Sequence, residues 1–443
     1  MSWIKRSVTG LLFLVTILIL SACGWFGDDP DTEVLRVVNF RVEDQAFYDW
    51  MIDQFTAENP HVRIEYDAVD TANYPQLLGA RIASGDLDVF FGEPHNVFDG
   101  SRSGSMLPLN DLDILDQIIE EYLSTGRLHD FSTDQTNQLI VPLNTTGMVV
   151  FYNQDLFAEH QLDVPQDWSE FVALLDALDS IANVDAPIIY GGREQWPANM
   201  ILNAVEAQIV RVAQPDFYQM LRRWDEEPSA RFNNDEWVET FTKTNTIFQY
   251  VQRNATGLSY AAAPSLFVTG NPQNNRLYPL MIDGSWSAAQ ILAAGPDFEV
   301  GTFILPANDE AENNRYLPFK PGAGLSIFNR SENIDLAKEF VTFHYRQDVY
   351  EKYLEMTLFG SVMTDISQTH PLTVGVFESG YTPLMIAENS IVPGMPWDTN
   401  EGLTNMLLGL LTPLEFANAI NNSIATQRTV WLQNIDLVNE KPE

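Results

Sequence analysis

The chain has 443 residues, of which 61 are Asp or Glu and only 24 are Lys or Arg, giving a formal net charge of −37. This length exceeds what one hydrophobic core ordinarily supports, so we expect two lobes. The acidic balance argues against a nucleic-acid partner, because neutralising phosphates requires clusters of basic side chains. We interpret the excess charge as a solvated surface outside the cell rather than as a cation-binding pocket.

The N-terminus has the pattern of an export signal followed by a lipid-attachment site. Two basic residues precede an apolar run over 11–20, which is about half as long as a membrane-spanning helix. The run ends in the sequence LSAC, which resembles the lipobox of bacterial lipoproteins. This resemblance implies a signal peptide over 1–22, lipidation of Cys23 and a flexible tether over 23–33. Because Cys23 is the only cysteine, no intrachain disulfide is expected.

The first part of the chain after the tether is predicted to alternate strands with helices. In chain order, the predicted elements are a strand at 34–40, a helix at 43–59, a strand at 62–66, a helix around 77–82 and a strand at 87–91. Short strands separated by helices are typical of βαβ units in a sheet of parallel type.

The stretch 141–157 predicts the passage of the chain from one lobe to the other. A polar turn at 142–146 precedes an apolar run of strand type at 148–152. Asn153 follows this run at the position from which it would cap a new amphipathic helix. A strand therefore leaves one lobe here and a helix begins in the second.

Further along, two local patterns predict helix starts. Asp167 and Glu170 have the spacing of a capping box. Helical stretches in 186–275 predict no definite topology. A buried strand at 277–282 then runs into a tight turn that ends at Trp286, and a helix follows.

These patterns resemble the family 1 extracellular solute-binding proteins, the maltose-binding-protein-like receptors of carbohydrate ABC importers. The resemblance rests on YNQDLF at 152–157 with DWSEF at 167–171, on FTAENPHVRIEYDAV at 55–69, on YPQLLGARIASGDLDVFFGE at 74–93, on DGSW at 283–286, on PGAGLSI at 321–327 and on DLAKEFV at 335–341. One departure is Leu87, which stands where the family usually has Pro.

The resemblance implies an α/β protein with a two-lobed, periplasmic-binding-protein-like type II fold. Each lobe would be a mixed sheet flanked by helices, and several chain crossings would form the hinge. Both lobes are expected to be discontinuous. The first would comprise 34–142 and 311–368, and the second 143–310 and 369–443, the latter including the C-terminal tail.

Catalytic and metal-binding motifs were not found in the sequence. It contains no G-x-S-x-G, H-E-x-x-H, Walker or C-x-x-C motif, and its six histidines are scattered. Adjacent carboxylates carry little information in so acidic a chain. We therefore predict no catalytic residues, no cofactor and no metal.

A sugar site needs flat aromatic side chains for the apolar ring faces and short polar side chains for the hydroxyl groups. We expect them at strand ends and in the crossing segments, where an α/β cleft opens. The candidate ligand-binding residues are Glu43, Asp44, Phe91, Glu93, Asn96, Asn144, Thr145, Trp196, Asn199, Asp283, Trp286, Gly322, Ala323 and Trp397. In the family, the element containing Trp286 carries a sugar-stacking aromatic; for Trp196 and Trp397, a role in the core is an equal alternative.

Together these patterns predict a monomeric extracytoplasmic lipoprotein that touches the cell membrane only through its lipid. It would capture a sugar or oligosaccharide between its lobes and deliver it to the permease subunits of an ABC transporter. Two alternatives remain open. One is an ABC receptor for a polyamine or another cation, which the acidic candidates permit, and the other is a lipoprotein enzyme acting on polysaccharide.

Overall fold

The structure is a computed structural model that describes residues 32–439, apart from 94–95, 98–99, 131–132, 216, 221–228, 371, 374–381 and 386–398. The predicted signal peptide, the lipidated Cys23 and the candidate Trp397 lie outside the described residues. Among the helices that are described, none is both long and apolar enough to cross a bilayer.

Five strands form the first sheet, in the order β2-β1-β3-β11-β6. Their bounds are β1 Glu33–Asn39, β2 Val62–Ala68, β3 Val89–Gly92, β6 Val141–Pro142 and β11 Gly324–Ile327. β1 pairs in parallel with β2 and β3, whereas β11 is antiparallel to both β3 and β6. The expected parallel sheet therefore covers only the first three strands, and the strand that returns from the other lobe makes the sheet mixed.

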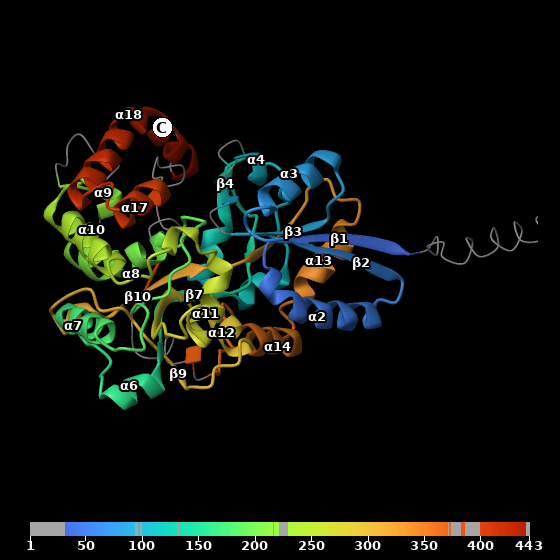
Figure 1. The fold of residues 1–443 in the computed structure, drawn as a ribbon. Helices are drawn as coiled ribbons and strands as arrows, with labels where there is room; N and C mark the ends of the chain where they lie inside the picture. Colours follow the sequence, from blue (N-terminus) through green and yellow to red (C-terminus); the bar gives the residue numbers. More distant parts are fainter. Residues whose placement is uncertain are drawn as a thin grey trace, which may run out of the picture.

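Helices cover both faces of the first sheet because its strands bury side chains on both sides. Figure 1 shows α3 on one side of the sheet and α2 with α13 on the other. The helix bounds are α2 Gln45–Glu58, α3 Tyr74–Ser84, α4 Gly100–Ser103, α5 Glu120–Leu123, α13 Ile334–Phe343 and α14 Gln347–Thr357. Phe47, Met51 and Phe55 are buried at helical spacing along α2, and Phe55 meets Phe340 of α13 edge-on at 5.4 Å.

The second sheet is built around β7. Its strands have the order β12-β10-β7-β8, and β9 also pairs with β7. The bounds are β7 Thr145–Asn153, β8 Leu280–Gly284, β9 Val300–Phe303, β10 Tyr316–Pro321 and β12 Thr382–Met385. β7 is antiparallel to β8, β9 and β10, whereas β12 runs parallel to β10. A separate hairpin consists of β4 Arg127–Asp130 and β5 Gln135–Gln138.

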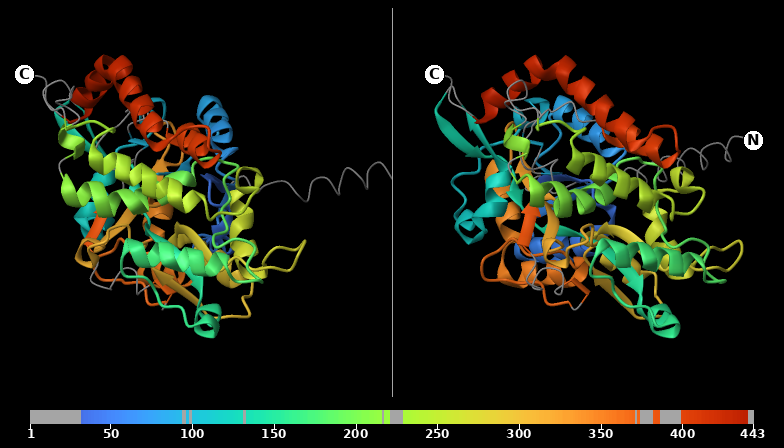
Figure 2. Two further views of the ribbon diagram at one scale, coloured as in Figure 1. Left: turned by 60° about the vertical axis from the view of Figure 1, so that its left-hand side comes forward. Right: turned by 90° about the vertical axis from the view of Figure 1, so that its left-hand side faces the viewer.

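The helices of the second lobe surround this sheet. Their bounds are α6 Gln154–His160, α7 Trp168–Asp179, α8 Ala198–Ala213, α9 Phe217–Met220, α10 Asp235–Phe248, α11 Ala263–Thr269, α12 Ala288–Ala293, α17 Thr399–Leu407 and α18 Pro413–Asn439. α8 packs on the sheet and against α10, and α18 lies across α10 (Figure 2). The C-terminal part of the chain thus returns to the second lobe, where β12 also lies.

Two predicted helix starts are confirmed in atomic detail. The Asn153 side chain accepts a hydrogen bond from the Leu156 amide at 2.9 Å, as an N-cap does. Asp167 likewise accepts from the Glu170 amide at 2.8 Å. The capping box is only half formed, because the Glu170 carboxylate accepts from the Gln166 amide instead of the Asp167 amide.

Two of the places where the chain passes between the two sheets lie next to each other. β6 leads into β7 through Leu143 and Asn144, and β10 leads back into β11 through Gly322 and Ala323. The two passages bond to each other: the Leu143 amide donates to the Ala323 carbonyl and the Gly322 amide to the Asn144 carbonyl, both at 2.9 Å. A Cβ atom at 322 would run into the Asn144 side chain, so any larger residue there would force Asn144 to move.

Two predicted boundaries are wrong because they depend on distant strand pairing. The first lobe was expected to resume at 311, but β10 belongs to the second sheet, so the return comes at Gly322. The polar turn at 142–146 is also too long. Thr145 and Thr146 already lie in β7, where they pair with β10, and β-branched threonine suits a strand.

Candidate functional site

Three aromatic side chains of the second lobe, Trp196, Tyr260 and Trp286, form what we call the aromatic cluster. The Trp196 ring centroid lies 4.6 Å from that of Tyr260 and 6.4 Å from that of Trp286. The Trp286 indole N–H donates to the Tyr260 hydroxyl. Trp286 follows β8 in a tight turn, and its ring lies against Gly284, where any Cβ atom would collide with it. The absence of a side chain at 284 therefore sets the place of the indole.

Asp283 holds the turn that carries Trp286. Its carboxylate accepts from the Gly284 amide at 2.8 Å and from the Ser287 hydroxyl at 2.7 Å. The Ser287 hydroxyl lies 3.3 Å from the Tyr260 hydroxyl, which links the turn to the aromatic cluster. Burial raises the pKa of Asp283 to about 6, although the hydrogen bonds from Ser287 and Gly284 oppose this rise. Asp283 thus acts by orienting its neighbours.

One ion pair joins the two lobes beside the aromatic cluster. Lys320 in β10 places its Nζ 2.7 Å from Oε1 of Glu93, which directly follows β3 of the first sheet. The same Nζ lies 5.7 Å from the centroid of the Trp286 ring, within the range of a cation–π contact. We call Lys320 and Glu93 the cross-lobe pair. It brings a predicted residue of the first lobe next to a predicted residue of the second.

A second charged group follows β1. Arg41 places its Nε 2.7 Å from Oδ2 of Asp44 and its Nη2 3.0 Å from Oε1 of Glu43, and its guanidinium lies 4.3 Å from the Phe359 ring centroid. Burial raises the pKa of Asp44 to about 6, and the charge of Arg41 opposes that rise. Burial alone would lower the pKa of Arg41. The two neighbouring carboxylates together have the larger effect, and the pKa of Arg41 is raised. The predicted acids Glu43 and Asp44 thus share one cation of the chain, Arg41.

The candidates in the crossing segments are buried and bonded within the hinge. The Asn144 side chain donates to the Tyr353 hydroxyl of α14. The Thr145 hydroxyl donates to the Lys320 carbonyl at 3.4 Å, and its amide donates to the Gly360 carbonyl at 3.0 Å. Gly322 and Ala323 complete the second passage, where their backbone groups are bonded as described above.

Three further candidates have other surroundings. Phe91 has no exposed surface and packs edge-on against Tyr48 at 5.3 Å, so it belongs to the core and the prediction that it contacts ligand is corrected. Asn96 accepts a hydrogen bond from the Glu93 amide at 3.1 Å and thereby shapes the loop of the cross-lobe pair. Asn199 donates to the Asn400 side chain at 2.6 Å, which ties the start of α8 to α17.

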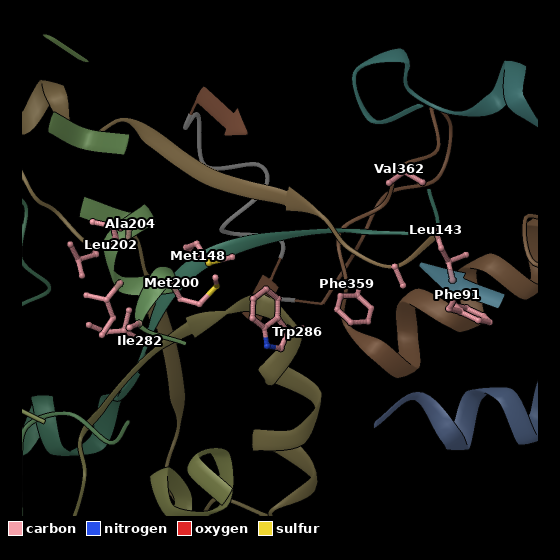
Figure 3. Packing of buried hydrophobic residues seen from close by; sticks show 14 of the residues in the cluster. Phe91, Leu143, Met148, Met200, Leu202, Ala204, Ile282, Trp286, Phe359 and Val362 are labelled. Atoms are coloured by element: carbon pink, nitrogen blue, oxygen red, sulfur yellow. The ribbon is translucent and has the colours of Figure 1, made fainter. Parts of the chain in front are cut away.

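The aromatic cluster adjoins the buried core where the lobes meet. Figure 3 shows Trp286 among the apolar residues of the second lobe, with Met200 on one side and Phe359 on the other. Leu143, at the first passage, and Phe91, in the first sheet, lie beyond Phe359 in this view and belong to the same hydrophobic cluster as Trp286.

Sequence reasoning missed three residues of this region: Arg41, Tyr260 and Lys320. Arg41 and Lys320 had a usable signal, since each stands within three residues of a predicted candidate in the chain. Tyr260 lies in the middle segment that predicted no topology, and its role depends on contacts with Trp286 and Trp196. No local pattern marked it.

The side chains gathered in this region are of kinds that suit binding. Its groups are aromatic faces, paired charges and hydroxyl or amide side chains, which recognise a polar molecule that has apolar faces. Over the part of the chain that the structure describes, no three His, Cys, Asp or Glu side chains gather in a way that could hold a metal ion.

Comparison with known proteins gives consistent matches over most of the chain. The model of the family "Bacterial extracellular solute-binding protein" matches residues 41–350. The "Multiple sugar-binding protein" of Streptococcus mutans is 25% identical over 371 residues, which cover 80% of this chain and 82% of that protein.

Solved structures match most of the chain. RafE in complex with raffinose has a TM-score of 0.73 at 20% identity, over 90% of this chain and 100% of that one. A sugar transporter from Bacillus licheniformis, solved with stachyose, has a TM-score of 0.69 at 15% identity, over 91% of this chain and 100% of that one. The predicted α/β, two-lobed type II fold is confirmed by these matches together with the two sheets.

Proposed function

Because the chain belongs to the bacterial extracellular solute-binding proteins, we propose that it captures a sugar or an oligosaccharide between its lobes and delivers it to an ABC importer. The observation that carries this proposal is the aromatic cluster beside the cross-lobe pair, where both lobes contribute side chains to one place. The relatives named for binding sugars support the same class of ligand.

The geometry suits a saccharide for a physical reason. A pyranose ring has apolar C–H faces, which stack on aromatic rings, and a rim of hydroxyl groups, which needs hydrogen-bonding partners. Trp286 is only 8% exposed, so its main role is to hold Trp196 and Tyr260 in place by packing against them. Contact with ligand then falls mainly to the half-buried Trp196 and Tyr260, with the edge of Trp286 between them.

The polar rim would come from both lobes. We assign it to Glu43, Asp44, Glu93 and Asn96 in the first lobe and to Asn199 in the second, with Asn144, Thr145, Gly322 and Ala323 forming the floor at the crossings. Trp397, outside the described residues, stays a predicted aromatic contact. Asp283 does not contact the ligand itself but holds the turn that positions Trp286. A ligand that touches both lobes binds the closed state more tightly than the open state and thereby stabilises it. The permease subunits would then recognise the closed state.

The protein would work outside the cytoplasmic membrane as a monomer on a lipid tether. Cleavage of the signal peptide after residue 22 would leave Cys23 as the lipidated first residue. Several acyl chains, each contributing about 0.8 kcal/mol per buried methylene, make such an anchor lasting. Radiolabelled palmitate should be incorporated into the wild-type chain in a bacterial host and not into Cys23→Ala.

The function is tested with a panel of neutral oligosaccharides, measured by thermal stabilisation and then by calorimetry. We expect at least one sugar to bind and to reduce the radius of gyration in small-angle scattering, without any product in chromatography. Product formation would favour the alternative of a polysaccharide-acting enzyme. Binding of polyamines but of no sugar in the panel would contradict the proposal.

Trp196→Ala tests the aromatic contact. We expect the affinity for the bound sugar to fall at least roughly 10-fold, because a half-buried aromatic ring that the proposal places against the sugar is lost. Trp168→Ala is a matched control: this tryptophan is also half-buried but lies in α7, next to Lys243 at 5.1 Å. Equal affinities of the two variants would remove Trp196 from the site.

A further inference from the structure

The aromatic face of Trp286 is already covered by a cation of the chain itself. The indole lies against the Gly284 backbone, the Lys320 ammonium lies over the ring at 5.7 Å from its centroid, and only 8% of the residue is exposed. The same ammonium is 2.7 Å from the Glu93 carboxylate. One side chain therefore occupies both the aromatic face and the carboxylate.

A carboxylate beside an aromatic face is the combination that binds organic ammonium ions, through an ion pair and a cation–π contact. Glu93 and Trp286 present this combination at the junction of the lobes, close to where the proposed sugar would bind. The side chains of Lys320 and Glu93 are only 15% and 30% exposed, so water screens the charges there less than at an open surface.

We propose that Lys320 determines the charge specificity of the site: it acts as a built-in ammonium ion that excludes cationic ligands such as polyamines and amino sugars. This inference rests on the proposed function, since it states which saccharides the site accepts. A ligand ammonium ion would have to displace Lys320 from Glu93 or lie next to a like charge, and both weaken binding. A neutral sugar meets neither obstacle, because its hydroxyl groups can bond to the pair as it stands.

The proposal predicts a gain of function, which damage to the fold would not produce. In Lys320→Met the side chain keeps a similar length but loses its charge, so the chain's own ammonium ion no longer competes with an external one for Glu93 and Trp286. We expect spermidine to bind this variant at least roughly 10-fold more tightly than wild type. Lys320→Arg keeps the charge and should bind spermidine as weakly as wild type.

Two controls separate this effect from the general attraction of an acidic protein for polyamines. Lys352→Met makes the same change of net charge at an ion pair on α14, where Lys352 contacts Glu355 at 2.8 Å. The double variant Lys320→Met/Glu93→Gln removes the carboxylate of the new site. We expect both to bind spermidine as weakly as wild type.

The experiment is calorimetric titration of the five proteins with spermidine at physiological salt, followed by titration with the sugar panel. Tight spermidine binding by Lys320→Met alone supports the proposal. Equal spermidine affinity of Lys320→Met and Lys352→Met overturns it, as does tight saturable binding by wild type. If no neutral sugar binds wild type, the proposed function fails, whereas the spermidine comparison still decides the role of Lys320.

Discussion

Replacing Asp283 by Asn should change the pH dependence of stability in a defined way. This carboxylate is 3% exposed, and burial raises its pKa from an ordinary 3.8 to about 6 in the folded protein. Between these two values the folded chain holds a proton that the unfolded chain has released. The free energy of unfolding therefore falls as the pH rises through this range, since stability increases with pH only where the unfolded state binds more protons.

The size of the effect follows from the two pKa values. A separation of about two pH units corresponds to about 3 kcal/mol at pH 7.5, where the ionised carboxylate must be kept buried. At pH 5 the free-energy cost of burying the Asp283 carboxyl group is about half as large. Asp283→Asn removes the charge and nearly keeps the shape, so the variant should exceed wild type in stability at pH 7.5 and lose part of that advantage at pH 5.

The measurement is urea unfolding of both proteins, followed by tryptophan fluorescence, at several values between pH 5 and 7.5. Asp185→Asn is a control of opposite sign: burial would raise the pKa of Asp185, but hydrogen bonds from Asn271, Asn274 and Tyr278 lower it. Its removal should reduce stability at neutral pH. A stability difference between Asp283→Asn and wild type that does not vary with pH would refute the reasoning.

Two further predictions concern the aromatic cluster and the hinge. Tyr260→Phe removes the acceptor of the Trp286 indole N–H, so we expect the free energy of unfolding in urea to fall by about 1–3 kcal/mol and sugar binding to weaken. In the control Tyr250→Phe, where the lost hydroxyl bonds an exposed carboxylate, the fall should be less than about 1 kcal/mol. Equal losses in the two variants would contradict this prediction. Gly322→Ala drives a Cβ atom into the Asn144 side chain, so scattering should show an altered radius of gyration with or without sugar, and unchanged curves would exclude a tight hinge.

Local patterns in the sequence predicted the elements well where neighbouring residues determine them. The strand expected at 34–40 is β1, Glu33–Asn39, and the helix expected at 43–59 is α2, Gln45–Glu58. Asn153 was recognised as a cap because an N-cap is read from a few adjacent residues. The resemblance added the two-lobed arrangement, which no local pattern contains.

Sheet membership and the composition of the site could not be predicted in the same way, because both depend on long-range contacts. β10 was placed in the wrong lobe since its partner β7 lies far away in the sequence. Lys320 and Glu93 are separated by 227 positions. Phe91 was taken for a ligand residue because it ends a strand, but the direction of its ring into the core is set by packing against Tyr48.

The position of β11 between β3 and β6 has a consequence for biosynthesis. β6 leaves the ribosome long before residues 324–327, and until those residues are made, the strand has no neighbour in its own sheet. The N-terminal half therefore cannot complete its sheet until β11 has been made, and the edge of β3 that β11 covers must wait for most of the polypeptide. For a chain exported unfolded, as the proposed signal peptide implies, this delay is an advantage, because the first sheet cannot close before residues 324–327 are available.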